Sequence, residues 1–211
     1  RCRVPALNLF ETFLGLIERP RATFLRIARS EQKNYVYLLF AGIGPLLLAL
    51  SLAVARVGDG RLHFGLVLML LVMGGPLFGL LLLSPAAWLM GKVNILVWKL
   101  RLPLRSTASA VAWSLFPLLL CSTVVLTVQV GLFGSFLFSQ NPAPWMLKPL
   151  EFWTLAGVDA AFLLWALLLL PHGFAPYGLS AREGALSMLP SLVFLCGAVY
   201  AAGKLLSLVL L

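Results

Sequence analysis

Asp159 has the clearest potential for chemistry in this sequence, because it is an acidic residue inside a long apolar segment. If that segment is a membrane helix beginning near Phe152, the carboxyl group lies about 10 Å inside it, at about 1.5 Å per residue. Ionisable side chains at such depth are costly and mark ion or substrate sites. The structural alternative is a protonated carboxyl bonded to Ser122 or Thr123 on a neighbouring helix, with Lys204 as the cationic candidate nearer the outer interface.

His63 and His172 are the two histidines, and imidazole is a common ligand of haem and chlorophyll metals. We expect them on opposite sides of the membrane, so they cannot form one bis-histidine site. Each stays a candidate for single pigment ligation, and a solvated or hydrogen-bonded imidazole is the alternative. The three cysteines (Cys2, Cys121 and Cys196) show no CxxC spacing, so we predict neither a metal site nor a disulfide framework.

Catalytic motifs are not found in the chain. It contains no Gly-rich phosphate loop, no H-E-x-x-H and no G-x-S-x-G, and its seven acidic residues are scattered. We therefore expect a protein that is not an enzyme and has no cofactor, although bound lipid is expected and a pigment stays open. Charged residues make up 11% of the chain, against about a quarter in a globular domain, and this deficit is typical of a protein solvated by lipid.

The apolar run Leu62–Gly91 decides the class of the protein, since it carries no charged residue over thirty positions. A bilayer core needs about 20 apolar residues of helix, so this run is too long for one straight crossing and too short for two with a loop. Gly74-Gly75-Pro76 and Pro85 interrupt it. Freed backbone groups must find partners in lipid, so we predict a kinked helix that other helices cover.

Four further apolar segments lead us to expect an all-α membrane helix bundle with five transmembrane helices in one domain, residues 35–211. The predicted spans are residues 35–55, 64–98 (kinked), 107–130, 152–170 and 184–208. Small residues at positions 106–110 and 112 are typical of a face that packs on another helix, and Pro117 should kink the third span.

Residues 1–34 are predicted to be an amphipathic interfacial segment, a helix pair broken at Pro20. Apolar residues at helical spacing alternate there with basic ones, a pattern typical of helices that lie in the headgroup plane. A solvated surface helix is the alternative. The interfacial basic motif consists of Arg19, Pro20, Arg21, Thr23, Phe24, Arg26 and Arg29.

The distribution of basic residues orients the predicted bundle. Twelve of the 16 Lys and Arg residues fall on the side of the N-terminus, and the other four are Arg56, Arg61, Lys148 and Lys204. By the positive-inside rule the N-terminus is cytoplasmic and the C-terminus outside, in what we expect to be a bacterial cytoplasmic membrane. The net charge of +9 therefore indicates anionic lipid headgroups as partners and not nucleic acid.

Three short motifs resemble those of the Yip-domain (Rab-interacting-protein-like) membrane proteins, bacterial type. Glu18–Ile27 resembles that family's Pro-Arg-x-Thr-Phe-x-x-Ile opening, Ala110–Pro117 its third-span entry, and Gly178–Ala185 the turn before its last span. The five-span count agrees. The resemblance implies a polytopic scaffold or adaptor. Eukaryotic members associate with Rab-type GTPases, but their long cytosolic N-terminal extension is absent here, so Rab binding is not expected.

These observations lead to two hypotheses of function. The first is a non-enzymatic scaffold or accessory subunit that packs against other integral membrane proteins or lipids in a hetero-complex, for example an energy-converting one. The alternative is a small-molecule or ion transporter that uses the intramembrane carboxylate of Asp159. A proton or ion relay normally needs more than one such group, which favours the first hypothesis.

Overall fold

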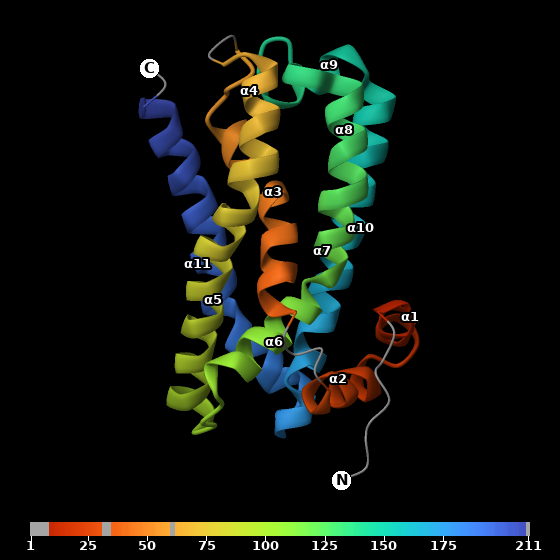
Figure 1. Cartoon of the computed structure of the whole chain (residues 1–211), viewed down its shortest axis with the longest axis vertical. Coiled ribbons are helices and arrows are strands. Elements are labelled where there is room, and N and C mark those ends of the chain that lie inside the picture. The colour runs from red at the N-terminus through yellow and green to blue at the C-terminus, as the bar shows by residue number, and fades with distance from the viewer. Residues whose placement is uncertain (1–8, 31–34, 60–61, 210–211) are drawn as a thin grey trace.

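Five long apolar helices run along the long axis of the molecule in the computed structural model (Figure 1). The structure describes residues 9–30, 35–59 and 62–209, and this part of the chain contains no β-strand. The five-span, all-α fold predicted from the sequence is confirmed. The spans are α3 (Val36–Val54), α4 with η2 and α5 (Phe64–Trp98), α7 with η3, α8 and η4 (Phe116–Phe138), α10 with η5 (Pro149–Tyr177), and α11 (Ala181–Val209).

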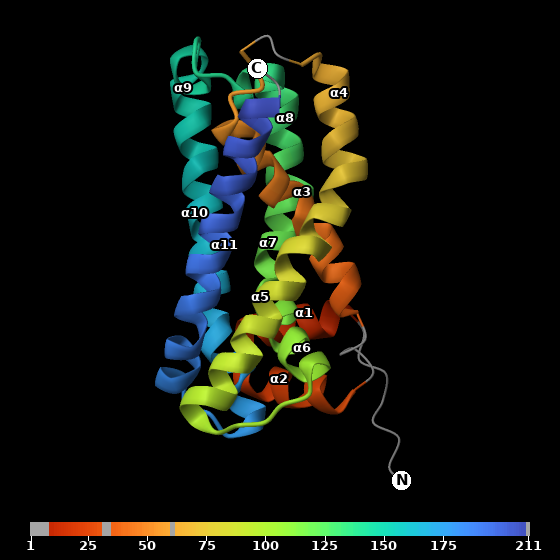
Figure 2. The same cartoon turned by 90° about the vertical axis from the view of Figure 1, so that its left-hand side faces the viewer.

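Shorter helices close the two ends of the bundle. Figure 2 shows α1 and α2 lying across the lower end beside α6, whereas α9 lies at the upper end with the end of α11. The described N-terminal and C-terminal helices therefore lie at opposite ends of the bundle, as an odd number of crossings requires. The bounds of the short helices are α1 (Leu9–Glu18), α2 (Pro20–Arg29), α6 (Leu104–Ser114) and α9 (Pro144–Leu147).

The second span bends where its glycines and proline predict. It consists of α4 (Phe64–Met69), the π-helical turn η2 (Leu70–Gly74) and α5 (Gly75–Trp98). Pro76 has no N–H to donate, and next to it the hydrogen-bond ladder widens, so that the N–H of Gly75 bonds to the carbonyl oxygen of Leu70. The kinked helix expected from the sequence is therefore a helix with one π turn.

Helix α3 covers this bend through backbone contact. A Cβ atom added to Gly44 would overlap the carbonyl oxygen of Gly75, and one added to Gly79 would overlap that of Phe40. Small residues let two helix backbones approach this closely. Since α3 is also the most buried span, with 56% of its apolar window covered, the α3–α5 crossing is the centre of the bundle.

The third span begins later than predicted. We expected a kinked helix over residues 107–130, but α6 ends at Ser114 and the span runs from Phe116 to Phe138. Pro117 cannot donate to the carbonyl of Trp113 and its ring clashes with that group, so the helix stops and restarts with Pro117 in its first turn. Helix α6 therefore turns under the bundle, where Thr107 and residues 109–114 are buried.

The predicted small-residue face of α6 does pack on another helix. A Cβ atom added to Gly173, at the end of α10 (Pro149–Gly173), would lie 2.7 Å from Ser114 Oγ and 3.1 Å from the carbonyl oxygen of Ala110. The Ser114 hydroxyl donates to the carbonyl of Ala110 at 2.7 Å, so it is satisfied inside its own helix. The close approach therefore leaves no polar group unpaired at this contact.

The N-terminal helix pair breaks at Pro20 as predicted, and α2 starts there. Its apolar side chains Phe24 and Ile27 are buried against the lower end of the bundle, whereas Arg21 and Arg26 are exposed. The apolar face of this basic helix is therefore covered by protein, which the sequence did not reveal. Residues 1–8, including Cys2, and residues 31–34 of the predicted segment lie outside the described residues.

Thr23 of the basic motif holds the corner between α1 and α2. Its hydroxyl donates to the carbonyl oxygen of Arg19 at 3.0 Å. A Cβ atom added to Gly15 would lie only 2.6 Å from that same hydroxyl. The Pro-Arg-x-Thr-Phe segment is thus explained locally by helix initiation at Pro20, by this tight corner and by the buried Phe24.

Candidate functional site

Asp159 lies in the middle of α10 and faces the broken third span. Its Oδ2 accepts a hydrogen bond from Gln129 Nε2 at 2.5 Å, and its Oδ1 accepts one from Cys121 Sγ at 3.1 Å. Gln129 is on α8 (Leu126–Phe133), and Cys121 opens the π-helical turn η3 (Cys121–Val125). Both carboxylate oxygens are therefore held by neutral donors from one neighbouring span.

The sequence predicted the correct neighbouring span but the wrong partners for Asp159. Thr123 donates instead to the carbonyl oxygen of Leu119 in its own span, at 2.9 Å, and the bonds found at Asp159 come from Cys121 and Gln129, not from the buried Ser122. A π turn carries more residues per turn than an α-helix, so spacing rules based on 3.6 residues misassign which side chains face α10.

Asp159 lines a groove with a volume of about 350 Å³, between α3, the third span, α10 and α11 (Ala181–Val209). Every other lining residue is apolar or a cysteine. Leu47 of α3, Leu163 of α10 and Leu195 of α11 lie on three of its walls. Leu163 is 49% exposed and Cys196 is also exposed, so the groove opens sideways on the bundle surface. A single carboxylate thus faces an otherwise apolar hollow at mid-span.

The cationic candidate Lys204 does not approach this carboxylate. Its ammonium group lies over the ring of Tyr200, 5.6 Å from the centroid, and the residue lines a separate hollow together with Arg56. That position is one and a half turns beyond the part of α11 that lines the groove, which ends at Val199. The ion pair considered from the sequence is therefore not formed.

The two histidines lie at opposite ends of the bundle, as predicted. His63 precedes α4 at the upper end, and His172 is in the last turn of α10 at the lower end (Figure 1). His172 Nδ1 lies 3.0 Å from the carbonyl oxygen of Leu168. Among the described residues, no three His, Cys, Asp or Glu side chains are close enough to hold a metal ion.

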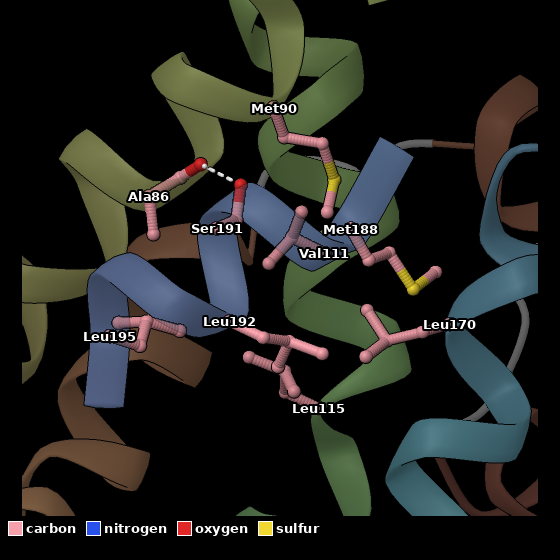
Figure 3. Close-up of a pocket in the computed structure, with 9 residues that line it drawn as sticks. All are labelled: Ala86, Met90, Val111, Leu115, Leu170, Met188, Ser191, Leu192 and Leu195. Carbon is pink, nitrogen blue, oxygen red and sulfur yellow. Dashed lines mark hydrogen bonds between the residues drawn. The ribbon is translucent and has the colours of Figure 1, made fainter. Parts of the chain in front are cut away.

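A second, much smaller hollow lies between α5, α6, α10 and α11 (Figure 3). Its volume is about 20 Å³, and Met90 and Met188 are among its lining side chains. The Ser191 hydroxyl at its edge donates to the carbonyl oxygen of Ala86 at 3.1 Å. Because the one hydroxyl is already paired and the other side chains are apolar, this hollow is a packing defect and not a ligand site.

Sequence reasoning missed a set of buried polar groups where α5 meets α6. The Asn94 side chain is fully buried, and neither its amide oxygen nor its nitrogen has a partner among the described residues; the same holds for Trp98 Nε1 and Thr107 Oγ1. A Cβ atom at Gly91, one turn before Asn94, would lie 3.6 Å from Thr107 Oγ1. These residue types follow no motif, so only the packing of α5 on α6 reveals them.

Asp59 closes the upper end of the bundle. Its Oδ1 accepts hydrogen bonds from Ser139 Oγ at 2.5 Å and from the backbone N–H of Gln140 at 2.9 Å. These bonds tie the turn after α3 to the loop after the third span. The bond from Ser139, then that from Gln140, holds the pKa of Asp59 below its usual value.

We expect Asp59→Ala to lower the free energy of unfolding at neutral pH but not at acidic pH. The pKa of Asp59 in the folded protein lies below its pKa in the unfolded chain, which is about 3.9. The carboxylate therefore stabilises the folded state above about pH 3.9, and this stabilisation is lost as the pH falls through the folded-state pKa. Because the carboxylate is exposed, the effect is under about 1 kcal/mol. Thermal unfolding at pH 7 and pH 3 checks this; an equal difference from wild type at both values would contradict it.

Comparison with known proteins gives this chain no relatives: no family model, no curated protein and no solved structure matches it.

Proposed function

We propose that this multi-pass membrane protein is a non-enzymatic scaffold or accessory subunit that packs sideways against other integral membrane proteins. The observation that carries the proposal is the sparse cover of the last two spans. Only 17% of the apolar window of α10 and 11% of that of α11 is buried, against 56% for α3. Two of the five spans therefore offer most of their surface to whatever surrounds the chain.

Small residues on these open faces support a protein neighbour. Gly157 and Ala161 lie one turn apart on α10, Gly197 and Ala201 lie one turn apart on α11, and all four are exposed. No described atom lies within 4 Å of a Cβ atom added to Gly157 or Gly197. Such small residues offer lipid chains little side-chain surface to pack against. A second helix backbone can approach them closely, as α5 approaches Gly44 within this chain.

The lower end of the bundle supports contact with lipid as well. Arg21, Arg26 and Arg29 extend from α2 while its apolar face is held by protein. A rigid basic helix at one end of the spans suits the anionic headgroups of the cytoplasmic leaflet. This agrees with the proposed cytoplasmic N-terminus. It is also compatible with the proposed scaffold role of Yip-domain type in a bacterial membrane.

The test is co-purification of the full chain from its native membrane in mild detergent, with partners quantified by mass spectrometry. We expect Gly157→Leu with Ala161→Leu to reduce at least one integral membrane partner about tenfold, a loss of about 1.4 kcal/mol in affinity. Gly65→Leu is the matched control, since Gly65 is also exposed and a Cβ atom there meets no described atom within 4 Å. Equal partner recovery from both variants would reject the proposal.

The alternative function, transport, is favoured by the position of Asp159 beside the groove. Its partners Gln129 and Cys121 are neutral, so the described site holds one ionisable acid and no chain of them. A flux measured in proteoliposomes that Asp159→Asn abolishes, while partner assembly stays intact, would replace the scaffold proposal. An unchanged flux in Asp159→Asn would remove the alternative.

A further inference from the structure

The groove beside Asp159 is a lateral opening formed by the divergence of the last two spans. Helices α10 and α11 meet at their lower ends, where a Cβ atom added to Gly184 would lie 2.8 Å from the carbonyl oxygen of Pro171. Toward the upper end they separate, and Figure 1 shows α3 between them. Leu47 and Leu50 of α3 therefore form the floor of the groove, and residues of α10 and α11 form its sides.

The size of the groove is that of a small-molecule site. At about 350 Å³ it is at the lower end of the range of about 300 to 1,000 Å³ found for such sites. An alkyl chain fits this volume, and its apolar walls suit it.

The single acidic group in the groove determines which polar group a bound alkyl chain should have. The lining has one acid, Asp159, and no basic side chain. Each of the two carboxylate oxygens accepts one hydrogen bond, from Gln129 and Cys121, so each keeps a lone pair for a further donor. A carboxylate at this depth in a membrane is costly without a cation beside it, and an acyl chain of a neutral lipid would supply none.

We propose that this groove binds a lipophilic amine, with its ammonium group on the carboxylate of Asp159 and its alkyl chain along the leucines of α3, α10 and α11. A primary ammonium group has three N–H donors, so it can donate to both open acceptor positions. Such a group resembles that of lysine, with a pKa of about 10.4, so it is protonated at pH 7. This binding site does not depend on the proposed scaffold role, because none of the exposed small residues proposed to meet a partner helix on α10 and α11 lines the groove.

The test compares dodecylamine with dodecanol on the full chain in nanodiscs of phosphatidylcholine. Native mass spectrometry counts one-to-one adducts, and protein-free nanodiscs correct for partition into lipid. We expect dodecylamine to bind about 10 to 100 times more tightly, the factor for a hydrogen bond to a charged group. Asp159→Asn should remove this preference, whereas Asp59→Asn, the same change in a loop outside the groove, should keep it.

Ala160→Phe provides a second arm, since Ala160 lines the groove and a phenyl ring there occupies it. We expect this variant to bind both compounds at least tenfold more weakly. Equal affinity of the wild-type chain for dodecylamine and dodecanol would overturn the proposal without any variant. A preference for the amine that survives in Asp159→Asn would overturn it too, and so would affinities for both compounds that Ala160→Phe leaves unchanged.

Discussion

Gly44→Ala lowers the midpoint of thermal unfolding by about 10 °C, as measured by the fraction of chain that stays monodisperse after heating in detergent. The new methyl group would overlap the carbonyl oxygen of Gly75 and lie 2.7 Å from the backbone nitrogen of Gly79. Both obstacles are backbone, so α3 and α5 must move apart. Overpacking of this kind costs about 3 kcal/mol, or about 10 °C in a chain of this length.

The control for this prediction is the same substitution in open space. Gly131 is an exposed residue of α8, and a Cβ atom there meets no described atom within 4 Å. Alanine is the better helix former, by up to about 1 kcal/mol, so Gly131→Ala should leave the midpoint unchanged or raise it by up to about 4 °C. The contrast separates close packing from helix propensity. A Gly44→Ala protein as stable as Gly131→Ala would show that α3 and α5 do not touch through their backbones.

The spans could be predicted from the sequence because lipid imposes one strict requirement. Every backbone group must be paired within its helix, so a run of about 20 apolar residues has one solution. The bend at Gly74-Gly75-Pro76 follows from the same requirement, since glycine and proline leave the ladder weak there. These features depend on residues that are close together in the sequence, so the sequence alone is enough to predict them.

Features that depend on tertiary packing could not be predicted from the sequence. Pro117 was expected to kink one helix, but it ends α6 and starts α7 (Phe116–Leu120), and α6 then packs against Gly173 under the bundle. A proline that kinks a helix and a proline at which one helix ends and the next begins can stand in the same local sequence. Asp159 was found as an intramembrane acid, but its partner Cys121 depends on the π turn η3, which local spacing does not encode.

Trp113→Ala should cost about 3 to 5 kcal/mol, the largest loss expected from a single side chain here. Trp113 is a fully buried residue of α6 and stacks on Phe116, with 5.8 Å between ring centroids. Phe116 contacts Phe13 of α1 at 5.8 Å, and Phe13 contacts Trp165 of α10 at 6.0 Å. The ring of Trp113 is therefore one end of an aromatic cluster that joins α6 to three other helices.

Trp153→Ala is the control for this substitution, because Trp153 is 65% exposed at the start of α10 and loses few contacts. The measurement is again the midpoint of heating in detergent, and Trp113→Phe should fall between wild type and Trp113→Ala, since it keeps a ring in the cluster. What the truncation removes is the close contact of the indole with neighbouring side chains, and each lost contact weakens the attachment of α6 to the bundle. Equal midpoints for Trp113→Ala and Trp153→Ala would mean that α6 is not packed beneath the spans.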